Sequence, residues 1–146
     1  MATGPTTTAT LQQGRRGTAG KLAQMPANIL ALRGATTFDL DESDHVTGRV
    51  VELIGQMLER NGVAHDDVIS ILFTATDDLT STFPATAART MGLGDVPLIC
   101  ARELAIEGAM PRCIRVLMHL STDLTRAQLR HVYLHQAQSL RDDLPA

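Results

Sequence analysis

The sequence predicts an α/β (α+β) domain in which two main helices cover one face of a mixed five-stranded sheet. Short apolar runs of strand length alternate with segments whose apolar residues recur at helical spacing, and turn-forming residues separate them. A strand–helix order of this kind is typical of a sheet with helices packed on it. The chain has 146 residues, 44% hydrophobic but only 3% aromatic, so we expect one core built from aliphatic side chains. The second sheet face is then left for another partner, most simply a neighbouring subunit.

Residues 1–27 differ in composition from the rest of the chain. They are rich in Thr, Ala, Gly and Gln and contain no acidic residue. We expect residues 1–27 to be a disordered tail, with Met25 as a second candidate start, and residues 28–146 to form a single domain. Because the N-terminus lacks the apolar region of a signal peptide, a cytoplasmic location is expected.

The first half of this domain predicts two strands and the longer helix. Residues 28–32 are an apolar run that we interpret as the first strand, ending at residues 33–37. An acidic cluster then favours a helix start, and Asn61-Gly62 is typical of a helix end. The continuous apolar run at residues 68–75 predicts a strand buried on both faces. The apolar residues of the helix that recur on one face are Val46, Val50, Leu53, Ile54, Met57 and Leu58.

A second helix and a third strand follow. Pro84 suits the first turn of a helix that extends to Met91, with Gly92 as its cap. Residues 96–100 predict the third strand, and Pro97 favours an edge position because proline cannot donate to a strand ladder.

The last part of the chain predicts two more strands. Residues 114–120 form the fourth, and Thr125 with Gln128 fits a capping box for a short helix. Residues 129–138 are interpreted as the fifth strand. In that strand Val132 and Leu134 alternate with His131, Tyr133 and His135.

Three polar side chains in this last part are hard to explain by packing alone. Arg115 interrupts an apolar strand, Tyr133 lies between Val132 and Leu134, and Arg141 follows Leu140. An arginine inside an apolar strand is costly unless it meets an anion or faces a cavity. The pattern therefore predicts a pocket for a small molecule that carries carboxylates.

Several classes of function are disfavoured by the same sequence. A net charge of -3 and the scarcity of aromatic residues argue against nucleic-acid binding. No apolar run approaches the roughly 20 residues of a membrane span. Cys100 and Cys113 are too few for a disulfide framework. His131 and His135 lack a third metal ligand at suitable spacing, and no nucleophile or phosphate-binding motif occurs.

Six separated segments resemble the monofunctional AroH-class chorismate mutases in order and spacing, over about residues 29–144. They are Leu32-Arg-Gly-Ala-Thr-Thr37, Phe83-Pro-Ala-x-Ala-x-Arg89, Val96-Pro-x-x-Cys-x-x-Glu103, Cys113-Ile-Arg115, Arg130-His-Val-Tyr-Leu134 and Leu140-Arg141. The resemblance implies conversion of chorismate to prephenate without a cofactor or metal. It also implies a homotrimer that forms a pseudo-α/β barrel, with active sites at the subunit interfaces.

The family match also implies roles for single residues. Arg115 and Glu103 are the expected catalytic residues: Arg115 donates to the ether oxygen and a carboxylate, and Glu103 binds on the side of the ring hydroxyl. Tyr133 is expected on a carboxylate and Arg33 near the hydroxyl end of the substrate. The full set of expected substrate-binding residues is Arg33, Phe83, Ala85, Arg89, Ile99, Cys100, Ala101, Arg102, Tyr133, Leu140 and Arg141.

Departures and alternatives accompany this prediction. Thr86 stands where the family often has lysine, and Arg102 is a cation where other members can have a neutral residue. Arg115 could instead pair with Glu103 for structure only. Two other functions stay open: a catalytically inactive trimeric small-molecule binding or regulatory protein, and an imine-hydrolysing enzyme on a similar trimeric fold.

Overall fold

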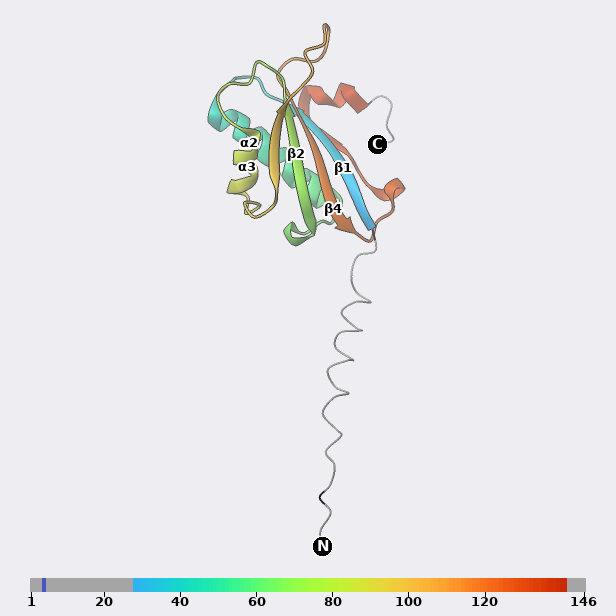
Figure 1. Ribbon diagram of the computed structural model, residues 1–146. Coiled ribbons are helices and arrows are strands. Elements are labelled where there is room, and N and C mark those ends of the chain that lie inside the picture. The colour runs from blue at the N-terminus through green and yellow to red at the C-terminus, as the bar shows by residue number, and fades with distance from the viewer. Residues whose placement is uncertain (1–3, 5–27, 142–146) are drawn as a thin grey trace.

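The computed structural model describes Gly4 and residues 28–141, so the predicted tail and the last five residues lie outside the described part. One mixed sheet has the strand order β3-β2-β4-β1-β5 (Figure 1). β4 runs antiparallel to both β1 and β2, whereas β3 and β5 add in parallel at the two edges. The strands are β1 (Asn28–Thr37), β2 (Val68–Ala75), β3 (Leu98–Arg102), β4 (Cys113–Thr122) and β5 (Val132–Tyr133). The predicted mixed five-stranded sheet is confirmed.

Two α-helices pack on one face of this sheet. α2 (Ser43–Arg60) crosses the strands, and α3 (Pro84–Thr90) lies beside it (Figure 1). α2 buries the six predicted apolar residues and ends where Gly62 adopts a φ of 60° and Val63 N–H donates to the Leu58 carbonyl at 2.9 Å. The short 3₁₀ segments are η1 (His65–Asp67), η2 (Arg126–Gln128) and η3 (His135–Arg141). No helix in the described residues has the length and apolar character needed to cross a membrane.

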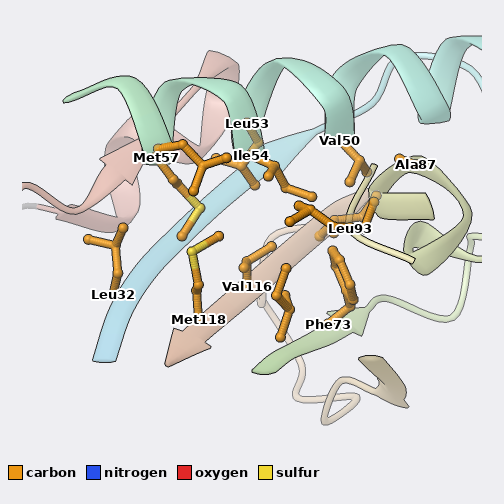
Figure 2. Close-up of a cluster of buried hydrophobic side chains, with 14 of the residues drawn as sticks. Leu32, Val50, Leu53, Ile54, Met57, Phe73, Ala87, Leu93, Val116 and Met118 are labelled. Carbon is orange, nitrogen blue, oxygen red and sulfur yellow. The ribbon is translucent and has the colours of Figure 1, made fainter. Parts of the chain in front are cut away.

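The core lies between α2 and the sheet and is aliphatic, as composition predicts. Figure 2 shows Leu53 and Met57 of α2 meeting Leu32 and Met118 of the strands, with the buried ring of Phe73 nearby. All five side chains are fully buried, and apolar burial of this kind contributes roughly 1.5–3 kcal/mol for each large side chain.

The first strand is longer than predicted because it continues through residues 33–37. Gly34 lies in its middle, where a Cβ would come within 2.5 Å of Met57 Sδ. A side chain at position 34 would therefore force Met57 to move from its place between α2 and β1.

The predicted fifth strand at residues 129–138 is wrong in length, because only Val132 and Tyr133 pair with β1. His135 follows with a φ of 53°, a left-handed conformation that turns the chain into η3. The His135 ring is held there, with its Nε2 2.7 Å from Oε1 of Glu52 on α2. The third strand also shifts, from the predicted 96–100 to Leu98–Arg102, so Pro97 precedes it, and its edge position is confirmed.

Along β4, the sheet face opposite the helices is the less buried of the two faces. Along β4, Ile114, Val116 and Met118 are buried, whereas the alternating Arg115 and Leu117 are half-buried. This uncovered sheet face is where the candidate site lies.

Candidate active site

A single cross-strand row runs through all five strands and brings together the predicted site residues Arg115, Ala101 and Tyr133. Arg115 on β4 is the register partner of Ala35 on β1 and Thr74 on β2. Thr74 pairs in turn with Ala101 on β3, and Ala35 pairs with Tyr133 on β5. Because directly paired residues project to the same face, the row places Arg115 at the centre of the uncovered sheet face.

Arg115 and Glu103 form the charged pair at the centre of this row. Arg115 Nε lies 3.5 Å from Glu103 Oε2, with side chains 39% and 23% exposed. Glu103 Oε2 also accepts from Thr74 Oγ1 at 2.8 Å, and its Oε1 accepts from the Leu104 N–H at 3.1 Å. These bonds fix the carboxylate beside the arginine.

The protonation state of Glu103 follows from these contacts. The Thr74 hydroxyl, the Leu104 amide and the Arg115 charge lower the pKa of Glu103 from its ordinary 4.5, although burial opposes them. Glu103 is therefore a carboxylate at neutral pH, and its negative charge lies beside the guanidinium of Arg115.

The ion pair with Glu103 leaves one hydrogen-bond donor of Arg115 without an acceptor in the described residues. Its Nε is buried, and within the described residues it has no hydrogen-bond partner, so the 3.5 Å contact with Glu103 is an ion pair without a hydrogen bond. A buried donor in this state favours an additional acceptor. The purely structural alternative predicts the ion pair but gives no reason for this remaining donor.

Arg33 and Tyr133 lie together on the β1–β5 side of the row. The Arg33 guanidinium carbon is 6.0 Å from the centre of the Tyr133 ring, and Tyr133 is 3% exposed beside Ala35 and Ala137. The Arg33 N–H donates to His131 Nδ1 at 2.9 Å. Burial and the charge of Arg33 lower the pKa of His131, so its ring is neutral at neutral pH.

A cavity of about 610 Å³ opens at the other end of the row. Among the predicted residues, Phe83, Cys100, Ala101 and Arg102 line it. Most of its remaining walls come from the loop between β2 and α3, and the end of β2 and the start of α3 add one residue each. The other lining residues are Ala75, Thr76, Asp77, Leu79, Thr80, Ser81, Thr82 and Pro84.

Asp41 ties that loop to the start of α2. Its carboxylate accepts from the Thr80 hydroxyl at 2.5 Å and from the backbone N–H groups of Thr80 and Ser81 at 3.1 and 3.0 Å. The hydrogen bonds of Thr80 and Ser81 lower the pKa of Asp41 to about 2. Asp41 thus stays ionised and keeps the cavity wall in place at any ordinary pH.

The other predicted site residues lie outside these groups. Ala85 is 4% exposed within the main core, Ile99 is 62% exposed on the uncovered face, and Arg89 is exposed on α3. Leu140 packs beside the cluster of Ala35, Tyr133 and Ala137. Arg141 ends η3, and its side chain is not described. The roles of these residues stay predictions.

Sequence reasoning missed two residues that shape the site. Thr74 holds Glu103, and Asp41 holds the loop. Thr74 had a visible signal, because it is a polar residue near the end of the apolar run at residues 68–75. Asp41 had none, since its partners lie about 40 positions further along the chain.

The chemistry available at this site is electrostatic. Burial raises the pKa of the Cys113 thiol, which disfavours the thiolate. The described residues contain no group of three or more His, Cys, Asp or Glu side chains that could hold a metal. What the geometry offers is a fixed cation, hydrogen-bond donors and apolar walls.

Fold and site together define an α+β protein with arginine side chains placed on one face of its sheet. The family model for type I chorismate mutases matches residues 29–144. The chain therefore belongs to the type I chorismate mutase family.

Named relatives agree with the family model. The chain is 44% identical over 117 residues to the chorismate mutase AroH of Thermus thermophilus, covering 80% of this chain and 96% of that protein. It is 38% identical over 117 residues to the Bacillus subtilis chorismate mutase AroH, covering 80% and 92%. A solved chorismate mutase from Clostridium thermocellum has a TM-score of 0.74 and 43% identity, covering 75% of this chain and 98% of that one.

Proposed function

We propose that this protein converts chorismate to prephenate. The reaction is an intramolecular Claisen rearrangement: one C–O bond of the ether breaks, one C–C bond forms, and no proton is transferred. It needs no nucleophile or general base, which suits a site of fixed charges. The family match supports this activity over imine hydrolysis. The observation that carries the proposal is Arg115, held beside Glu103 on the uncovered sheet face with a buried donor to spare.

Arg115 is the proposed electrostatic catalyst. Negative charge gathers on the ether oxygen as the C–O bond lengthens, so a donor aimed at that oxygen binds the transition state more strongly than the substrate. The position of Arg115 is fixed before the reaction by Glu103, which Thr74 holds in turn. Preorganised donors of this kind contribute roughly 3–4 kcal/mol to catalysis.

The remaining proposed residues restrain the substrate in its reactive conformer. Arg33 and Tyr133, which lie close together, bind its polar and carboxylate groups. Phe83, Cys100 and Arg102 line the cavity that holds the ring. Because the reacting atoms belong to one flexible molecule, holding them in contact lowers the entropic part of the barrier.

We also propose a homotrimer with active sites between subunits. The uncovered sheet face supports it, because Ile29 and Ile99 are 71% and 62% exposed there. The separation of the Arg33–Tyr133 pair from the cavity at β3 supports it too, since a neighbouring chain would complete each part. A cytoplasmic location is proposed as well, and the free thiols of Cys100 and Cys113 support it.

The direct test is the loss of the ultraviolet absorbance of chorismate when the purified protein is added. We expect saturable loss with prephenate as the product, in a sample whose mass in solution equals three chains. Tight binding of chorismate without turnover would instead favour the inactive binding protein. Neither turnover nor binding would reject the proposed function.

We further expect kcat to be nearly constant from mildly acidic to mildly alkaline pH. Because the pKa of Glu103 is lowered below 4.5, its ionised form predominates above that value and is lost only as the pH falls through the lowered pKa. The lowered pKa of His131 likewise keeps that ring neutral near pH 7. A pH series of kcat at saturating chorismate checks this. A sharp bell within the range would show acid–base catalysis instead.

A further inference from the structure

We propose that Asp77 limits the affinity of the cavity for anionic ligands by holding Arg102 in an ion pair. Asp77 is thus a specificity-determining residue. The inference rests on the proposed function in one respect, namely that a dianionic substrate enters this cavity. The pair joins Arg102 Nε to Asp77 Oδ1 at 2.6 Å. Arg102 ends β3, and Asp77 lies in the loop that follows β2.

Asp77 and Arg102 are the charged residues among those that line the cavity. Their charges cancel, so the wall offers no net attraction to an anion. A substrate with two carboxylates meets one cation that is already occupied and one carboxylate that repels it. This arrangement is unexpected for a site that binds a dianion, and it calls for a reason.

The pair is weak enough for a ligand to compete with it. The side chain of Arg102 is 78% exposed and that of Asp77 is 46% exposed. Ion pairs in contact with water contribute little to stability, so a ligand carboxylate can replace Asp77 as the partner of Arg102. Each binding event then includes the cost of breaking this pair, and affinity is lower than the cation alone would give.

The opposite role for Asp77 is also physically clear. Asp77 could orient Arg102 toward the substrate, as Glu103 orients Arg115. Removal of Asp77 would then weaken binding. The two roles predict effects of opposite sign, which makes the sign the decisive observation.

The experiment compares Asp77→Asn, Arg102→Gln and the double variant with the wild type. We expect Asp77→Asn to lower KM for chorismate by about 1.5- to 5-fold, in line with the small strength of an exposed pair, with kcat within about twofold. Arg102→Gln should raise KM. In the double variant, most of the decrease in KM caused by Asp77→Asn should disappear, because the Arg102 guanidinium that Asp77→Asn frees is absent.

Asp66→Asn is the matched control. It removes the same charge from an exposed residue of η1, which precedes β2, whereas the cavity lies beyond the other end of that strand. Its KM should equal that of the wild type. An unchanged or raised KM for Asp77→Asn overturns the proposal. An equal decrease in KM with and without Arg102 also overturns it, because it would indicate repulsion between Asp77 and the substrate alone.

The outcome also separates this proposal from the proposed function. If the wild type turns over chorismate and Asp77→Asn brings no gain, the function stands and the role of Asp77 is rejected. If no variant turns over chorismate, calorimetry measures its dissociation constant directly. A lower dissociation constant for Asp77→Asn would then support the role of Asp77 while the function fails. Absence of chorismate binding in every variant would reject both.

Discussion

Replacement of Arg115 by alanine is expected to lower kcat for chorismate by about 10²- to 10³-fold or more, the scale on which loss of a preorganised donor acts. The physical reason is that Arg115 provides positive charge where negative charge develops on the ether oxygen. Arg115→Lys should recover little of this, because an ammonium group cannot reproduce the planar fork of donors that both an ether oxygen and a carboxylate require. Steady-state kinetics by chorismate absorbance measures the loss.

The fold should survive this replacement. Arg115 lies on the uncovered sheet face rather than in the core, and Glu103 keeps its bonds to Thr74 and the Leu104 amide. Arg60→Ala is the matched control, since it removes the same charge from the last turn of α2 and should leave kcat unchanged. If folded Arg115→Ala turns over chorismate at the wild-type rate, Arg115 is not the catalyst and the pair with Glu103 is structural.

The sequence predicted those parts of the fold that depend on local periodicity. The spacing from Val46 to Leu58 identified the buried face of α2, and Pro97 placed β3 at an edge. It failed at residues 129–138, where alternation resembled a long strand. There Val132 packs in the main core and Tyr133 in a second cluster, so two separate packing surfaces imitate strand periodicity. The left-handed turn at His135 has no signal in composition, because it depends on Glu52 of α2.

The candidate site was predictable where a residue is out of place in its own strand. Arg115 and Tyr133 were noticed because each is polar within an apolar run, and the structure places both on one cross-strand row. The partner of a charged side chain could not be predicted in this way. Nothing in the sequence links Asp77 to Arg102, and the role proposed for Asp77 rests on the 2.6 Å contact between them. Spatial pairing between distant segments is the information that a single sequence does not contain.

Asn61 shows how pairing between distant segments supports the site. Asn61→Ala is expected to destabilise the protein by about 2–4 kcal/mol, because it removes three buried hydrogen bonds. Its Nδ2 donates to the carbonyls of Met57 and Arg130 at 2.8 and 2.9 Å, and its Oδ1 accepts from the Arg130 N–H at 2.7 Å. Asn61 is 7% exposed, so water replaces these bonds poorly. Urea unfolding measures the loss.

The three bonds join the end of α2 to the residue two positions before β5, and their loss should therefore loosen Tyr133 as well. Faster amide exchange at residues 130–134 than in β4 is expected in Asn61→Ala, together with a higher KM. Asn28→Ala is the control. Within the described residues, Asn28 makes one side-chain bond, from its Nδ2 to the Leu124 carbonyl at 3.0 Å, so the replacement should cost about 1 kcal/mol or less. Equal destabilisation by the two variants would mean that Asn61 ends a helix and nothing more. A larger loss of stability in Asn61→Ala, with faster amide exchange confined to the region of β5, would mean that the side-chain amide of Asn61 couples α2 to Tyr133.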